Sequence, residues 1–305
     1  MSPSKVTKPA DGHAGARRCA ALLGMAVCAE TTSATLQEEA RKVDLKLSFR
    51  DPFTNASHNL NCQVKSGVSF KAASSTKKTI KLKGISKETI EAFKNSLGLI
   101  TWVPPRPWSA IYWFICRPGT KAKHISMSTD TQKISPALRF ILAREFAQRQ
   151  KRPAIARQTV AGPMASKALL KTSRSIYRGI KTVPNPLFGA IAITRSAWRH
   201  ITRRSKTTAS RDRSLRVLPH LRAIIGNQPD SHSVKEASIR DEGRSSIERR
   251  VIVCWYGDAL VLDGKHTTVM LRICEEISYP KAWHKFPLSE SDVFYKSTLL
   301  SWWAK

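Results

Sequence analysis

The chain has 305 residues, and 52 Lys and Arg against 22 Asp and Glu give it a formal net charge of +30. An apolar fraction of 41% excludes wholesale disorder, and six cysteines in so long a chain exclude a disulfide-dense scaffold. No apolar run reaches the roughly 18 residues of a spanning helix, and the excess of cations points to an anionic partner, nucleic acid before membrane.

The positive charge is concentrated in the middle of the chain. Residues 151–222 hold 17 cations and one acid, whereas residues 223–305 hold 11 of each. Such a shift in composition predicts a domain boundary on each side of the basic segment. The predicted organisation is a disordered arm at 1–13, a domain at 14–150, a basic linker at 151–190 and a smaller domain at 191–305.

The cysteines and one N-terminal stretch bear on the cell compartment. None of the cysteines forms a C-x-x-C pair, which is typical of reduced, buried thiols in a cytoplasmic protein and argues against structural zinc. Residues 17–29 begin with two arginines and continue with small and apolar residues, as a short secretory signal does. Because the stretch is only weakly hydrophobic, we favour a buried first helix and a cytoplasmic location.

The first half of the chain alternates helical and strand patterns. Residues 14–28 are predicted to form a helix, and residues 43–65 a β-hairpin, because two runs of alternating apolar and polar residues flank turn-forming residues at 51–59. The elements expected next are short strands at 68–72 and 79–83, a helix at 86–96, strands at 97–103, 110–116 and 124–127, and a helix at 134–150.

The second half is rich in proline and arginine before it becomes rich in β-branched residues. Gly257-Asp258 and Asp263-Gly264 are typical hairpin turns, and the apolar runs that they join predict a three-stranded antiparallel meander. The elements expected here are a helix at 164–178, a helix at 215–225, a loop at 229–244 and strands at 250–256, 259–262 and 267–273.

One set of polar residues lies on the predicted hairpin. Asp44 opens its first strand, and the run Q-V-K-S-G at residues 63–67 ends its second. Gln63 and Lys65 are two residues apart, so on a strand they point to the same side. This order of helix, hairpin, Q-V-K-S-G, helix and further strands resembles the PD-(D/E)xK, or restriction-endonuclease-like, superfamily. Within it, residues 14–150 are similar to a bacterial family of unknown function with an Asp…Q-V-K-S core.

The resemblance implies an α/β or α+β fold, with a mixed sheet flanked by helices, and metal-dependent cleavage of phosphodiester bonds. Asp44 matches the aspartate of the family, Gln63 takes the place of its second acid, and Lys65 matches its lysine. Asp44 and Gln63 would bind Mg²⁺ or Mn²⁺, which stabilises charge on the phosphate and activates water. Lys65 would orient that water or hold the phosphate.

The resemblance also implies a third metal ligand. Family members carry a glutamate on the first helix, whereas residues 14–28 contain no acid. Glu39, or its neighbour Glu38, is the expected substitute because both lie just before the strand of Asp44. The missing helical acid argues for a second reading, in which the protein binds nucleic acid on a degenerate nuclease fold without cleaving it.

The basic segment supplies the expected phosphate contacts, since its cations are not balanced by acids. A third reading assigns metal-free acid–base chemistry on RNA to His200, in a C-terminal domain that loosely resembles small ribonucleases. We expect DNA as the partner, with RNA as the alternative, and no oligomeric state is indicated. The predicted nucleic-acid-binding residues are Arg195, Arg199, His200, Arg203, Arg204 and Lys206.

Overall fold

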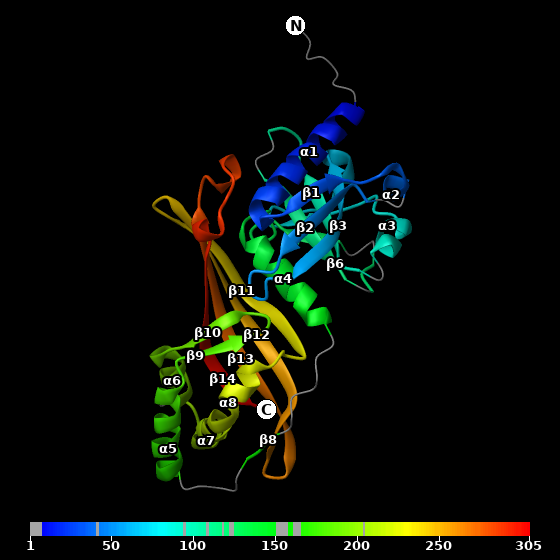
Figure 1. The fold of residues 1–305 in the computed structure, drawn as a ribbon. Coiled ribbons are helices and arrows are strands. Elements are labelled where there is room, and N and C mark those ends of the chain that lie inside the picture. Colours follow the sequence, from blue (N-terminus) through cyan, green and yellow to red (C-terminus); the bar gives the residue numbers. More distant parts are fainter. Residues whose placement is uncertain are drawn as a thin grey trace. The chain divides into compact units, whose positions relative to one another are not determined.

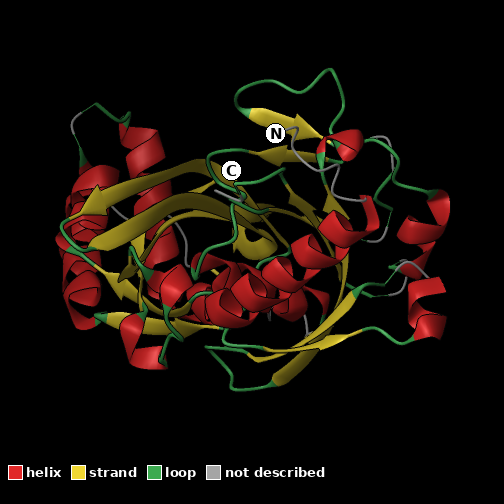
Figure 2. Cartoon of the chain, turned by 90° about the horizontal axis from the view of Figure 1, so that it is seen from above, coloured by secondary structure: helices red, strands yellow, loops and turns green. Residues whose placement is uncertain are grey.

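The structure is a computed structural model, in which the chain forms two compact units. Both helices and strands contribute to it (Figure 2). Unit 1 is built from Met1–Phe146, Asp241–Ser246 and Tyr279–Val293. Unit 2 is built from Ala147–Arg240, Ile247–Ser278 and Phe294–Lys305. The structure describes residues 8–40, 43–93, 96–107, 110–117, 119–121, 125–150, 158–160, 166–203 and 205–305.

Unit 1 contains a five-stranded mixed sheet of order β1-β2-β3-β5-β6 (Figure 1). β1, β2 and β3 are antiparallel neighbours, β5 lies parallel to β3, and β6 is antiparallel to β5. Because parallel neighbours need a crossover, the chain leaves the sheet between β3 and β5. The strands are β1 (Glu30–Ser33), β2 (Leu45–Arg50), β3 (Ser57–Ser66), β5 (Gly98–Val103) and β6 (Tyr112–Cys116).

Each face of this sheet has its own apolar core. On one face, α1 (Lys8–Val27) and α4 (Ala137–Arg149) bury residues such as Leu23 and Leu138 against Leu47 and Leu99. On the other face, Ile100 and Trp102 of β5 pack with residues from the crossover and from β7. The elements on this second face are the 3-10 helix η1 (Val68–Phe70), β4 (Thr79–Lys81), α3 (Lys87–Ala92) and β7 (Ser126–Ser128).

Unit 2 is built on a seven-stranded sheet of order β11-β12-β13-β14-β10-β9, with β8 pairing β12. β13 and β14 are antiparallel, whereas β10 runs parallel to β14. The tight turn between β12 and β13 has positive φ at Asp263 and Gly264, 52° and 74°, as a hairpin turn requires. The strands are β8 (Gln158–Thr159), β9 (Thr182–Asn185), β10 (Gly189–Ile193), β11 (Ser231–Glu242), β12 (Ser245–Leu262), β13 (Lys265–Pro280) and β14 (Phe294–Ala304).

The helices of unit 2 form one layer on its sheet (Figure 1). Leu169, Ile201 and Leu218 from this layer pack with Leu271 and Trp302 from the strands. The helices are α5 (Ser166–Gly179), α6 (Arg195–Thr202), α7 (Thr208–Val217) and α8 (Leu221–Gly226); the 3-10 helices of the chain's second half are η3 (Leu218–His220), η4 (Trp283–Lys285) and η5 (Glu290–Asp292). Among the described residues, no helix has the length and apolar character to cross a membrane.

Several predicted elements are confirmed. The mixed α and β composition is as expected, the hairpin at 43–65 is the antiparallel pair β2–β3, and the helices at 134–150 and 164–178 are α4 and α5. The turn at Asp263-Gly264 also forms. The hairpin could be predicted because β2 alternates fully between buried and exposed residues, whereas α4 is buried on most of its surface, including Arg139 and Arg144.

Other expectations differ from the structure. Residues 8–13, placed in a disordered arm, belong to α1, and α5, β9 and β10 are part of the folded unit 2 rather than of a linker. The expected linker residues 151–157 and 161–165 lie outside the described residues. The expected consecutive domains also differ, since Asp241–Ser246 and Tyr279–Val293 belong to unit 1.

The β-structure of unit 2 is more extensive than the predicted meander. The loop expected at 229–244 is largely β11, and β14 was not predicted. β12 runs without a turn through Gly257-Asp258, where Asp258 has a φ of 49° inside the strand. Residues that favour positive φ can therefore mark a local irregularity of a strand as well as a hairpin turn.

Candidate functional site

The predicted polar residues come together where β2 begins and β3 ends. Asp44 directly precedes β2, and its Oδ2 atom accepts a hydrogen bond from the backbone N–H of Val64, with an N···O distance of 2.6 Å. The backbone N–H of Asp44 donates to the carbonyl of Cys62 at 2.9 Å. The Asp44 carboxylate is therefore fastened to the segment of β3 that carries Gln63 and Lys65.

A break in the strand pattern explains the orientation of Asp44. In a regular strand Val43 and Leu45 would share a face. Instead Val43 packs in the core on the α3 side of the sheet, whereas Leu45 packs in the core on the α1 side. The alternation is interrupted at Asp44, and its side chain takes the place of a backbone acceptor for the N–H of Val64.

Gln63 is the least exposed member of the set. Leu60 and Cys62 face the core beneath α1, so Gln63 and Lys65 face the opposite side of the sheet. The side chain of Gln63 is buried, with 1% exposure, and its Oε1 atom has no hydrogen-bond partner among the described residues. Buried polar atoms are normally paired, so this oxygen is suited to accept a ligand such as a cation.

Lys65 is held by the turn that follows it. Its Nζ atom lies 5.1 Å from the centre of the Phe70 ring, a cation–π distance. Gly67 has a φ of 93°, which glycine adopts without strain and which turns the chain into η1. The indole N–H of Trp102 donates to the Gly67 carbonyl at 3.0 Å. The residues after Lys65 are thus fixed against β5.

Glu39 and Glu38 have different surroundings. Glu39 is exposed on the short helix α2 (Leu36–Ala40), and its role as a metal ligand stays a prediction. Glu38 pairs with Lys46 and accepts two hydrogen bonds of 3.0 Å from Thr35. The hydrogen bond from Lys46 is the main cause that lowers the pKa of Glu38 to about 2. The Glu38 carboxylate is therefore held in an ion pair with Lys46.

The first helix contains an acid that lies outside the predicted helix at 14–28. α1 begins at Lys8 and so includes Asp11, whereas the predicted helix begins at residue 14. Pro9 and Asp11 are residues typical of a helix start, and they could have placed the beginning of the helix correctly. One turn later, a Cβ atom added at Gly15 would lie 2.6 Å from Oγ of Ser66, so α1 passes close to the end of β3.

The donor atoms of this site suit a hard divalent cation. Mg²⁺ prefers oxygen ligands and is often held by one or two carboxylates together with waters and substrate phosphates. The Asp44 carboxylate and the unpaired Gln63 Oε1 are oxygen donors of this kind. No group of three or more His, Cys, Asp or Glu that could hold a metal occurs within the described part of the chain. A cation here would therefore depend on the substrate for further ligands.

The predicted phosphate-binding residues lie in unit 2. Arg195 and Arg199 are exposed on α6, Arg203 is exposed after it, and Lys206 is half-buried; Arg204 lies outside the described residues. Burial is the main cause that lowers the pKa of the half-buried His200, and repulsion from Arg203, Lys206 and Arg272 adds to it. A lowered pKa favours the uncharged form of the His200 imidazole.

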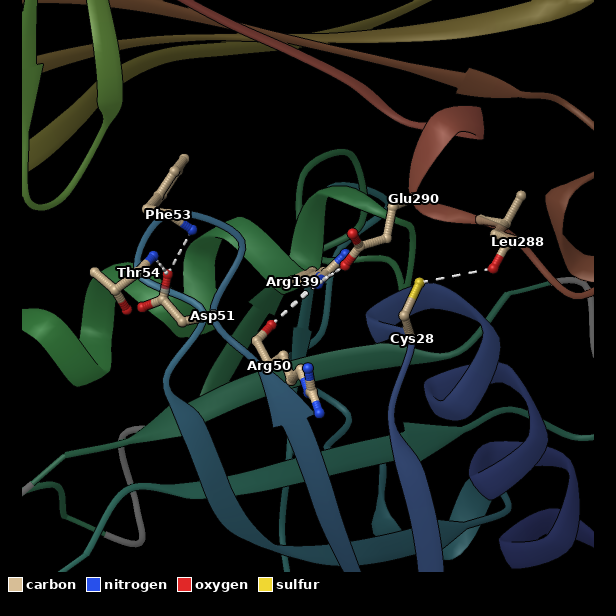
Figure 3. A network of polar contacts seen from close by, with 8 residues as sticks. All are labelled: Cys28, Arg50, Asp51, Phe53, Thr54, Arg139, Leu288 and Glu290. Carbon is tan, nitrogen blue, oxygen red and sulfur yellow. Dashed lines mark hydrogen bonds and ion pairs between the residues drawn. The ribbon is translucent and has the colours of Figure 1, made fainter.

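Figure 3 shows a second polar network in unit 1, centred on Arg139 of α4. The guanidinium donates from Nε and Nη2 to the carbonyl of Arg50, both at 3.2 Å, and from Nη2 to Glu290 at 2.7 Å. Cys28 donates through its thiol to the carbonyl of Leu288 at 3.9 Å. These contacts fasten the segment Tyr279–Val293 within unit 1 and bring together no set of reactive groups.

Comparisons with protein-family models, with curated proteins and with solved structures found no match. The function is therefore inferred from the residues of this chain. Unit 1 offers a carboxylate, a buried amide oxygen and an ammonium group at the meeting of two antiparallel strands. Unit 2 offers an exposed cationic surface on its helices.

Proposed function

We propose that unit 1 is a metal-dependent nuclease that cleaves DNA phosphodiester bonds, with Asp44, Gln63 and Lys65 as its site. One observation carries this proposal: the carboxylate of Asp44 is bonded to the N–H of Val64, between Gln63 and Lys65. The sheet supports it, because three antiparallel strands, a crossover and a parallel strand agree with the mixed sheet of PD-(D/E)xK nucleases.

The three side chains would have different roles in the reaction. Asp44 and Gln63 would hold Mg²⁺ or Mn²⁺ through their oxygen atoms. The bound ion would stabilise charge on the phosphate and lower the pKa of the attacking water. The ammonium group of Lys65 would bind a phosphate oxygen or orient the water, and the Phe70 ring restricts where that group can lie.

The charge of the chain supports a nucleic acid as the partner. A net charge of +30 attracts a polyanion over a long range, and the exposed Arg195 and Arg199 of α6 are suited to contact phosphates. All six cysteines are free and five of them are buried, which agrees with a reducing compartment such as the cytoplasm.

Cleavage of plasmid DNA, with Mg²⁺ or with a chelator, tests the proposal. We expect nicking or linearisation with Mg²⁺ or Mn²⁺, none with chelator, and a rate at least about 100-fold lower in Lys65→Ala. Arg50→Gln is the matched control, because it removes one cation from the far end of β2. Equal rates in wild type and Lys65→Ala would contradict the assigned site.

The same assay separates the two competing readings. The lack of an acidic cluster among the described residues favours a protein that binds DNA without cleaving it. That reading predicts salt-sensitive binding with no cleavage under any metal. A ribonuclease-like unit 2 predicts instead that RNA is cleaved in the presence of chelator and that His200→Ala abolishes this cleavage.

A further inference from the structure

The outer face of α5 carries a continuous row of cations. Leu169, Ser173 and Tyr177 are buried on the inner face of the helix. At about 100° per residue, the cations fall within about 60° of one another on the opposite side. We name this row the α5 stripe; its members are Lys167, Lys171, Arg174 and Arg178, and all four are exposed.

The α5 stripe stands on a firmly packed helix. The Tyr177 ring lies 5.1 Å from the ring of Trp198 on α6, and its hydroxyl donates to the carbonyl of Thr194. Ser173 donates to the carbonyl of Leu215 on α7 at 3.4 Å. Both neighbouring helices pack on the same core as α5, so the stripe belongs to the layer that also presents Arg195 and Arg199.

The charge of this layer is almost uncompensated. Residues 166–226 contain 14 cations and a single acid, Asp212, which lies 3.7 Å from Arg211. One more cation of this segment, Arg216, pairs with Asp263 at 2.8 Å. In the described part of the chain, no ion pair involves a residue of the α5 stripe. No ion pair with a described residue therefore offsets the charge of the row, and its electrostatic complement is an external polyanion.

We propose that the α5 stripe binds the phosphate backbone of a nucleic acid, without reading its sequence and without a metal. The stripe is about 16 Å long, which spans four to five base-pair steps of a duplex at about 3.4 Å of duplex axis per step. This inference depends on the proposed function in one respect: the nucleic acid bound by the stripe would also be the substrate of unit 1. Lys and Arg side chains that contact phosphates position the nucleic-acid backbone, but they do not reach the base edges within a groove. We therefore expect binding without specificity for base sequence.

A nucleic acid fits this surface better than an anionic membrane does. A helix that lies in a membrane surface needs an exposed apolar face. The apolar faces of α5 and α6 are buried in the core of unit 2. The large exposed apolar side chains found among the described residues lie on other elements: Leu36, Val68, Val234, Ile239, Phe286 and Phe294.

The test compares two triple variants with the same change in charge. Lys171→Gln/Arg174→Gln/Arg178→Gln removes three cations of the stripe, and Lys265→Gln/Lys296→Gln/Lys305→Gln removes three exposed cations that lie on β13, on β14 and directly after β14. Binding to a labelled DNA duplex and to an RNA strand, each of about 30 nucleotides per strand, is measured with chelator between about 0.05 and 0.3 M salt. Circular dichroism confirms that each variant is folded, and Lys167→Gln/Lys171→Gln replaces the triple variant if it is not.

We expect the stripe variant to bind about 30- to 100-fold more weakly than wild type near 0.15 M salt. The slope of the logarithm of the binding constant against that of the salt concentration should fall by the equivalent of about two to three phosphate contacts. The binding constant of the control variant should change less than about threefold. Equal losses in the two variants, or binding to phosphatidylserine vesicles but not to nucleic acid, would overturn the inference. Stripe-dependent binding without any Mg²⁺-dependent cleavage would uphold it while contradicting the nuclease.

Discussion

Gln63 is the residue at which this chain departs most from the nuclease motif that it resembles. Its position is almost fully buried, and the carboxylate of Asp44 is fastened to the next residue of the strand. A second carboxylate here would be buried beside a like charge, and both effects disfavour its ionised form. An amide keeps an oxygen donor in place without that cost, but it lowers the affinity for a cation.

Gln63→Glu should therefore make unit 1 dependent on metal for stability. Without metal we expect the free energy of unfolding to fall by about 1–3 kcal/mol, because the buried carboxyl group lacks a hydrogen-bond donor. With Mn²⁺ we expect a larger rise in melting temperature than for wild type, since a ligand that binds the folded state stabilises it. Thermal unfolding with and without Mn²⁺ measures this, with Gln63→Leu as the control that cannot bind metal. An Mn²⁺ effect no larger in Gln63→Glu than in Gln63→Leu would contradict a cation site.

The pairing of Glu38 with Lys46 predicts a dependence of stability on pH. The folded pKa of Glu38 is lowered from 4.5 to about 2, so its contribution is present above about pH 4.5 and is lost as the pH falls towards 2. Glu38→Gln should thus lower the urea midpoint slightly at pH 7, and the difference from wild type should vanish near pH 2. A difference in urea midpoint between wild type and Glu38→Gln that stays constant with pH would show that the ion pair does not contribute to stability.

The close approach of α3 to β5 is the sharpest packing constraint among the elements of unit 1. A Cβ atom added at Gly98 would lie 2.1 Å from the ring of Phe93, whose side chain is 1% exposed. Gly98→Ala should therefore cost about 1–3 kcal/mol by overpacking. Gly12→Ala in α1 is the control, because nothing lies within 4 Å of the added atom and helix propensity improves by up to about 1 kcal/mol. In urea unfolding, Gly98→Ala should lower the free energy of unfolding and Gly12→Ala should raise it. A Gly98→Ala variant as stable as wild type would contradict this packing.

Elements of unit 2 show where pattern reading fails. β11 is exposed along most of its length, and its burial follows no alternation, so its polar sequence resembles a loop. Its strand conformation depends on pairing with β12, which begins after only two intervening residues, and not on an alternating pattern within β11 itself. In contrast β2 alternates fully between buried and exposed residues, and its hairpin could be predicted from that period alone.

At the scale of the whole molecule, the units are not consecutive stretches of sequence. Unit 1 includes Tyr279–Val293, where Trp283 packs on the core beneath α1 and Glu290 pairs with the buried Arg139. A domain cut at residue 150, as charge and composition suggest, would lack these contacts. The boundary read from composition therefore differs from the boundary of the folded unit.

A fragment of residues 1–150 should consequently be less stable than unit 1 within the full chain. We expect the free energy of unfolding to fall by about 2 kcal/mol or more, because a partly buried tryptophan leaves the core and Arg139 loses its ion pair with Glu290. Hydrogen exchange of the β3 amides in fragment and full chain measures the difference. A synthetic peptide of residues 279–293 should restore part of the protection, and identical protection without peptide would contradict the discontinuous unit.

By itself the sequence determined the mixed composition of helices and strands, the β2–β3 hairpin, the α4 and α5 helices and the cationic middle segment. These features depend on residues close together in the chain, whose periodicity and charge are local properties. Only the tertiary structure decided that Asp44 turns out of the strand pattern to bind Val64, that Gln63 is buried with an unpaired oxygen, and that Tyr279–Val293 completes unit 1. Each of these depends on strand register and on packing between distant segments, which local periodicity does not specify.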